Sequence, residues 1–135
     1  MWSQKGGNRE ERSALVELQL KPLKQVRLEN VKSSYVFQSG RESSINFSIA
    51  ADEKSIYKSK LFKLEISTDA QGISIDGKNA FYGVMMEANE GESVRIPLYV
   101  WAKDAQLLMR LSLVRVQEEG RVLFDEKMAT IVARE

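Results

Sequence analysis

Residues 91–116 read GESVRIPLYVWAKDAQLLMRLSLVRV, and apolar side chains recur in them at every second position. One face of the first half carries Val94, Ile96, Leu98, Val100 and Ala102. After a polar break at 103–106, the apolar run resumes with Leu107, Met109, Leu111 and Leu113. A period of two is typical of a β-strand with one buried face. Two such runs around a short break predict a β-hairpin at the centre of the core.

Similar alternation recurs on both sides of this stretch. The clearest runs are Ile45–Ile49 and Phe62–Ile66, and further runs lie at 14–20 (continuing to Val26 and Leu28), 33–37, 73–75, 81–85 and 129–133. Asp76-Gly77 is a strong hairpin signal between two of them. About eight short strands with spacings of roughly 8–12 residues, and no long helix between them, predict an all-β antiparallel sandwich.

Two irregularities interrupt the alternation. After Leu113 the phase changes, because Val114 and Val116 fall on the face of Arg110 and Ser112. This change predicts either a bulge near Leu113–Val114 or a strand that is covered on both faces. Gly83 interrupts the run at 81–85, which we interpret as the return arm of the Asp76-Gly77 hairpin, and a glycine there suggests a bulge or a close backbone contact.

In the number and spacing of its strands, the chain resembles immunoglobulin-like and fibronectin-like sandwiches. The chain has no cysteine, so it lacks the paired cysteines with a tryptophan between them that mark antibody domains. A resemblance of this kind implies a fold, and such folds host unrelated functions.

The division of the chain follows from its composition. Residues 1–12 are polar and charged, and we interpret them as a flexible N-terminal tail in which Trp2 is the only large apolar side chain. The alternatives are an arm that orders on a partner with Trp2 as its anchor, and a short helix capped by Asn8. Residues 13–135 are interpreted as a single β-sandwich domain, whose first strand ends or bends at Pro22.

The composition argues against several classes of function. The 135 residues carry a net charge of +1 and contain neither histidine nor cysteine, so no metal, cofactor or histidine-based catalytic site is expected. The densest basic segment, with lysines at 54, 58, 60 and 63 beside Tyr57 and Phe62, is diluted by acids, and nucleic-acid binding is not expected. No apolar run reaches the roughly 18–20 residues of a membrane span.

Acidic residues gather at three predicted turns, Asp52-Glu53, Glu90/Glu92 and Glu118-Glu119. Their spacing fits no EF-hand loop. Paired carboxylates also serve glycoside hydrolysis, but we find no aromatic platform beside them. We therefore interpret them as solvated turn residues and predict no catalytic residue.

The candidate binding residues are Arg95, Pro97, Tyr99 and Trp101, which alternate with the apolar face of Val94–Val100. Aromatic side chains and arginine on one exposed surface are typical of an interface. Pro97 suggests an edge strand, which another chain's strand can join. The opposing interpretation covers both faces of the sheet and makes Trp101 part of the core.

These patterns favour a non-enzymatic interaction module, an accessory or adhesion-type domain that binds a protein partner or itself through a sheet face or an edge strand. The alternatives are an assembly or chaperone subunit that holds client segments by strand-edge pairing, and a small carboxylate-based hydrolase. The sequence predicts no particular small-molecule ligand. It leaves the compartment open, with a slight preference for an extracytoplasmic or cell-envelope location.

Overall fold

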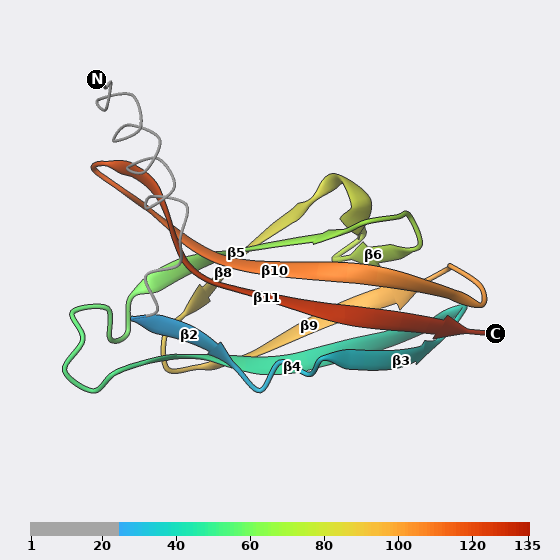
Figure 1. Ribbon diagram of the computed structural model, residues 1–135, viewed down its shortest axis with the longest axis horizontal. Helices are drawn as coiled ribbons and strands as arrows, with labels where there is room; N and C mark the ends of the chain where they lie inside the picture. Colours follow the sequence, from blue (N-terminus) through green and yellow to red (C-terminus); the bar gives the residue numbers. More distant parts are fainter. Residues whose placement is uncertain (1–24) are drawn as a thin grey trace, which may run out of the picture.

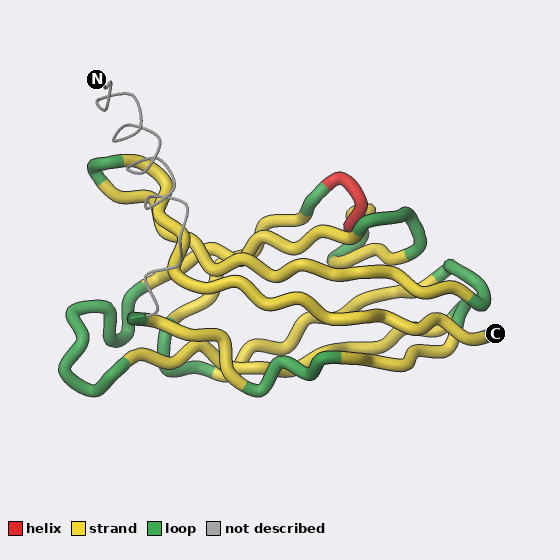
Figure 2. The backbone as a smooth tube through the Cα atoms, in the orientation of Figure 1, coloured by secondary structure: helices red, strands yellow, loops and turns green. Residues whose placement is uncertain are grey.

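The alternating runs form strands in a computed structural model that describes residues 25–135 (Figures 1 and 2). The strands are β2 (Val26–Glu29), β3 (Ser34–Gln38), β4 (Arg41–Ala51), β5 (Leu61–Thr68), β6 (Ile73–Ile75), β7 (Lys78–Asn79), β8 (Val84–Asn89), β9 (Ser93–Val100), β10 (Ala105–Gln117) and β11 (Gly120–Arg134). A single 3-10 turn, η1 (Ala80–Tyr82), precedes β8. The predicted tail, the strand at 14–20 and Pro22 lie outside the described residues.

The strands build two five-stranded sheets, so the all-β, sandwich-like prediction is confirmed. The first sheet has the order β3-β11-β10-β5-β8, and the second has the order β2-β4-β9-β6-β7. The second sheet is curled into a half-barrel. The described part already holds ten strands against about eight expected, and β7, with only two residues, is too short to give a periodic signal.

The core lies between the sheets and is built from the predicted faces. Ile45, Phe47 and Ile49 of β4 and Phe62, Leu64 and Ile66 of β5 are all buried. Ile96, Leu98 and Val100 enter from β9, and Leu107, Met109, Leu111 and Leu113 enter from β10. One contiguous apolar cluster therefore joins both sheets, and its burial is the main source of stability.

The predicted hairpin between the runs of residues 91–116 is wrong. β9 pairs with β4 and β6 in the second sheet, whereas β10 pairs with β11 and β5 in the first. The break at 101–104 is an arch from one sheet to the other, anchored where Trp101 and Ala102 donate their N–H groups to the carbonyl of Gly72. Both runs do face one core, and the alternation specifies that face but not the pairing partner.

The Asp76-Gly77 turn is confirmed, but the run at 81–85 is not its return arm, contrary to the prediction, because none of those residues pairs with β6. Asp76 and Gly77 both have positive φ angles, 53° and 76°, as a two-residue type I′ turn requires. Only Lys78 and Asn79 then pair with β6. The chain leaves the second sheet through η1 and Gly83 and enters the first sheet as β8, which pairs with β5 (Figure 2).

The phase change after Leu113 coincides with a bulge, which was one of the two predicted alternatives. Leu113 lies opposite Asp125 and Val114 lies opposite Leu123, so Phe124 is the extra residue on β11. Because of this extra residue, Phe124 and Asp125 are both buried although they are neighbours in the chain. The charged residues Asp125, Glu126 and Lys127 lie inside β11, which runs unbroken from Gly120 to Arg134.

Pro97 does not mark an edge strand, because β9 lies between β4 and β6. The pairing of β6 with β9 covers only Leu98–Val100, however, and ends one residue short of Pro97. Proline has no N–H to donate, and it is tolerated where a neighbouring strand has ended. The prediction failed for the strand as a whole, while the local environment of Pro97 resembles an edge.

Candidate functional site

The predicted binding residues lie on the outer side of the second sheet. Arg95, Pro97 and Tyr99 occupy exposed positions of β9, and Trp101 follows the end of that strand. Tyr99 and Trp101 are each 40% exposed. This exposure is intermediate between that of a side chain free in solvent and that of a side chain in the core. Pro97 and Tyr99 border a shallow hollow of about 200 Å³ with Ser74 of β6, whereas Arg95 and Trp101 do not line it.

A larger hollow lies on the outer side of the first sheet, a cleft of about 620 Å³. We call it the β8 cleft, and its main polar and rim residues are Glu65, Tyr82, Met85, Arg110, Arg121 and Glu126. Antiparallel register brings them together in cross-strand rows. One row runs Met128–Arg110–Ser67, and the next runs Glu126–Ser112–Glu65–Met85.

The rim of the β8 cleft is apolar and exposed. Tyr82 of η1 is 73% exposed and Met85 of β8 is 51% exposed. The Tyr82 ring contacts the half-exposed ring of Phe81 edge-on, with 5.2 Å between centroids. Its hydroxyl accepts a hydrogen bond from Nε2 of Gln71 at 3.2 Å. These contacts hold the aromatic side chain in place while leaving most of its surface in solvent.

The floor of the β8 cleft is charged but balanced. Arg121 makes a two-pronged contact with the carboxylate of Glu65. Nε of Arg110 lies 3.9 Å from Oε2 of Glu126, and the Ser112 hydroxyl donates to the same oxygen at 3.4 Å. Each carboxylate faces a guanidinium, so neither is arranged as a free base for acid–base chemistry. Geometry of this kind suits binding better than reaction.

The sequence missed this site for a topological reason. Arg110 and Ser112 were recognisable as the outward side of a strand, but Met85 joins them only because β8 pairs with β5 and β5 pairs with β10. Tyr82 was expected inside a strand and instead lies on the 3-10 turn. No local signal in the sequence specifies those neighbours.

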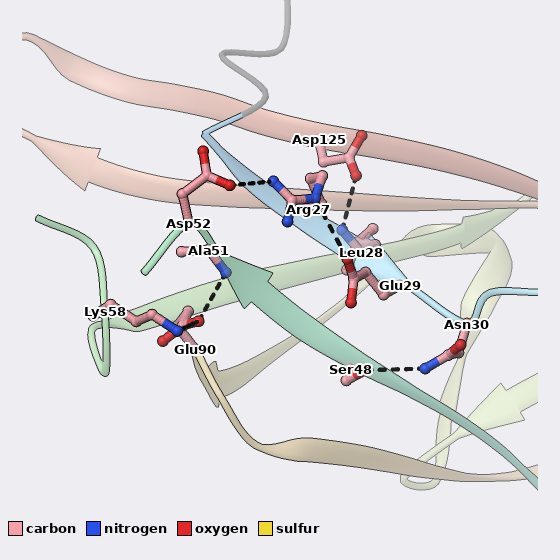
Figure 3. A network of polar contacts seen from close by, with 10 residues as sticks. All are labelled: Arg27, Leu28, Glu29, Asn30, Ser48, Ala51, Asp52, Lys58, Glu90 and Asp125. Atoms are coloured by element: carbon pink, nitrogen blue, oxygen red, sulfur yellow. Dashed lines mark hydrogen bonds and ion pairs between the residues drawn. The ribbon is translucent and has the colours of Figure 1, made fainter. Parts of the chain in front are cut away.

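One predicted turn acid, Glu90, is not solvated, since only 4% of its surface is exposed. Its two carboxylate oxygens accept hydrogen bonds from the backbone N–H groups of Ala51 and Ser59, both at 2.8 Å. Nζ of Lys58 lies 3.6 Å from Oε2 (Figure 3). Burial alone raises the pKa of Glu90, but these three partners outweigh it and hold the pKa below its ordinary value.

A second buried carboxylate lies in the same network. Oδ2 of Asp125 accepts the N–H of Leu28 at 2.8 Å and so links β11 of the first sheet to β2 of the second (Figure 3). On the solvent side, Arg27 pairs with Glu29 and Asp52. Glu90 and Asp125 both accept hydrogen bonds from the backbone of other segments, and this structural role explains why the two carboxylates are buried.

The basic segment is arranged for packing. Phe62 is fully buried, and the Tyr57 ring contacts Phe62 and Phe124 at 6.1 and 4.8 Å between centroids. The guanidinium of Arg115 lies over both Tyr57 and Phe62 at 5.8 Å. Neither ring is therefore free to stack on a nucleic-acid base in this arrangement.

Among residues 25–135, no group of three or more acidic side chains is placed to hold a metal ion. No helix in this part of the chain has the length and apolar character to cross a membrane. Comparison with known proteins found no protein-family model and no curated protein that matches this chain. Its function is therefore inferred from the arrangement of its own residues.

Proposed function

We propose that this chain is a non-enzymatic protein-interaction module and that its partner docks in the β8 cleft. The observation that carries the proposal is the exposed apolar rim of Tyr82 and Met85 beside the paired arginines of the floor. Tyrosine, methionine and arginine are enriched at protein interfaces, and a few such anchors provide most of the binding energy.

The strand order supports an immunoglobulin-like accessory or adhesion-type domain. The order β2-β4-β9-β6 corresponds to strands A, B, E and D of such domains, and β11-β10-β5 corresponds to G, F and C. The parallel pairing of β3 with β11 is consistent with a first strand divided between the sheets. The chain departs from that pattern because it passes through β6 and β7 before it reaches β8.

The predicted surface on β9 is the second candidate for the docking site. Tyr99 and Trp101 are less exposed than Tyr82, and the hollow beside Tyr99 is smaller than the β8 cleft. Arg95 adds a charge on the same face of β9. We retain Arg95, Pro97, Tyr99 and Trp101 as the alternative surface, because an experiment that separates the two is simple.

The two alternative functions differ in their support. Within residues 25–135, one edge of β8 has no strand partner, and this favours strand addition, as a chaperone or assembly subunit would use. The carboxylate-based hydrolase has less support. Glu90 is occupied by backbone donors, and Glu65 and Glu126 face arginines. A hydrolase needs one carboxyl group to exchange protons with its substrate.

The test selects a random peptide library displayed on phage against the immobilised protein and resynthesises the enriched peptides. In the β8 cleft, Tyr82→Ser with Arg110→Ala should weaken their binding at least tenfold, as loss of an anchor does. The matched variant on β9, Tyr99→Ser with Arg95→Ala, should leave binding within twofold. Melting temperatures of both variants verify the fold. Peptides that respond only to the β9 variant, or no enrichment at all, would overturn the β8 cleft as the docking site.

A further inference from the structure

In the described part of the chain, β8 is an edge strand of the first sheet. It pairs with β5 along one side, and within residues 25–135 no strand pairs with its other side. Alternate residues of an antiparallel strand direct their N–H and C=O groups to opposite sides. About half of the backbone polar groups of Val84–Asn89 are therefore available to another strand.

The edges at β2, β9 and β7 of the described chain are protected. The β2 edge is capped where Asp125 accepts the N–H of Leu28, and the unpaired part of β9 contains Arg95 and Pro97. Charged residues and proline are the usual means by which sheet edges avoid joining other chains. β7 has only two residues, which is also a protection.

β3 is the remaining edge strand of the first sheet. A tight turn at Ser39-Gly40 leads from β3 directly into β4 of the second sheet, and the two strands contact each other. β3 and β2 therefore close the same side of the sandwich (Figure 1). In contrast, β8 lies on the opposite side of the first sheet, and its sequence VMMEAN contains no proline and a single charged residue, Glu87.

We propose that the partner of this edge is a second copy of the chain. Two β8 strands would pair antiparallel about a two-fold axis and join the two first sheets into one continuous sheet of ten strands. This inference rests on the proposed binding surface, since Met85 belongs to the rim of the β8 cleft. A self-complementary patch is what a two-fold interface requires.

The alternation of side chains restricts the register of this pairing. Opposite residues in an antiparallel pair point to the same face. In a continuous two-fold sheet, one residue of β8 must therefore lie directly opposite its own copy, with the axis midway between the two. We name each register by that residue. An axis at Met86 or at Glu87 allows five residues of each β8 to pair.

Charge decides between these two registers. An axis at Glu87 places that carboxylate directly opposite its own copy, which is destabilising. An axis at Met86 instead places Met85 opposite the partner's Glu87 and Val84 opposite the partner's Ala88. The second arrangement buries apolar side chains and separates the acids, so the geometry points to the Met86 register.

The absence of native cysteine makes a cross-linking test specific. Met86→Cys should form a disulfide-linked dimer under mild oxidation, because opposite Cα atoms lie about 4.5–5.5 Å apart, within disulfide range. Glu87→Cys should cross-link much less. Val36→Cys, on the exposed face of β3, is the control for random collisions. Equal yields from all three variants, or the highest yield from Val36→Cys or Glu87→Cys, would refute the Met86 register.

A charge test covers the case in which Met86→Cys disturbs packing. Met85→Lys places a lysine opposite the partner's Glu87 and should preserve the dimer, whereas Met85→Lys with Glu87→Lys opposes two lysines and should produce monomers. Sedimentation velocity should give wild-type protein twice the chain mass of 15.4 kDa. A wild-type chain that stays monomeric up to roughly 100 µM, where even weak specific contacts are populated, would overturn the proposal.

The two proposals fail separately. Peptide capture by a monomeric wild-type chain would leave the β8 cleft as a binding site and remove the dimer. If the wild-type chain dimerises, the Met85→Lys with Glu87→Lys variant is monomeric and no peptide is enriched, the dimer stands and the β8 cleft is removed as a peptide-binding site.

Discussion

Glu90 shows how one residue fixes three segments. Its carboxylate binds the end of β4 through Ala51 and the β4–β5 loop through Ser59, while its own N–H donates to the carbonyl of Lys60. A buried carboxylate is costly unless it is fully hydrogen-bonded, and here two backbone donors and Lys58 supply that compensation.

Glu90→Gln should therefore destabilise the protein by about 2 kcal/mol, since hydrogen bonds to a charged group are lost and the amide directs an N–H at one of the backbone donors. Glu92→Gln is the matched control in the same turn, and because Glu92 is exposed its effect should stay within about 0.5 kcal/mol. Urea unfolding measures both. Equal effects would contradict the role assigned to Glu90.

The lowered pKa of Glu90 gives this contribution a pH dependence. The unfolded chain binds the proton at the ordinary glutamate pKa, about 4.3, and the folded chain binds it at a lower pH. The stabilisation is therefore fully present above about pH 4.3 and is lost as the pH falls through the folded-state pKa. Unfolding curves of wild type and Glu90→Gln should converge below that range, and a gap that stays constant would contradict the prediction.

At the scale of elements, the sequence predicted faces well and partners poorly. Ile45–Ile49 and Phe62–Ile66 form the expected strands, and the phase change at Leu113 identified the bulge. The pairing of β9 and β10 was wrong, since a polar break between two apolar runs is compatible with a hairpin and with an arch between sheets. A side-chain period of two carries no information about which backbone lies alongside.

The candidate site shows the same limit. Tyr99 was correctly placed on the outer side of β9, since alternation alone determines that. The β8 cleft depends on β8 crossing back to the first sheet after the Asp76-Gly77 hairpin, which is a long-range choice of partner. Glu90 was taken for a surface residue because a turn sequence does not reveal which neighbouring segments cover it.

Buried leucines of β9 and β10, the two strands joined by the arch at 101–104, should lose similar amounts of stability when truncated to alanine. Leu98 in the second sheet and Leu111 in the first are both buried, so Leu98→Ala and Leu111→Ala should each destabilise by about 2–5 kcal/mol. Glu118→Ala, at the turn between β10 and β11, should cost about 0.5 kcal/mol or less. Denaturant melts test this order, and a small effect of either leucine variant would mean that its strand does not face the core.

At the scale of the whole molecule, the two sheets depend on each other. Each sheet exposes one side to solvent and buries the other against its partner, and one apolar cluster spans both. The backbone crosses between the sheets repeatedly, at β2–β3, β3–β4, β4–β5, β5–β6, β7–β8, β8–β9 and β9–β10. A sheet that separated from its partner would expose the whole buried face, so partly folded states are expected to be costly.

Trp101 provides a test of this coupling, because it lies on the arch between β9 and β10 and its backbone N–H donates a hydrogen bond to the carbonyl of Gly72. Its fluorescence should report docking of the two sheets, whereas far-ultraviolet circular dichroism reports strand formation. With Trp2→Phe to remove the other tryptophan, the two signals should follow one transition in urea, as a two-state domain requires. Loss of the Trp101 signal at a lower urea concentration would show that the sheets separate before their strands unfold.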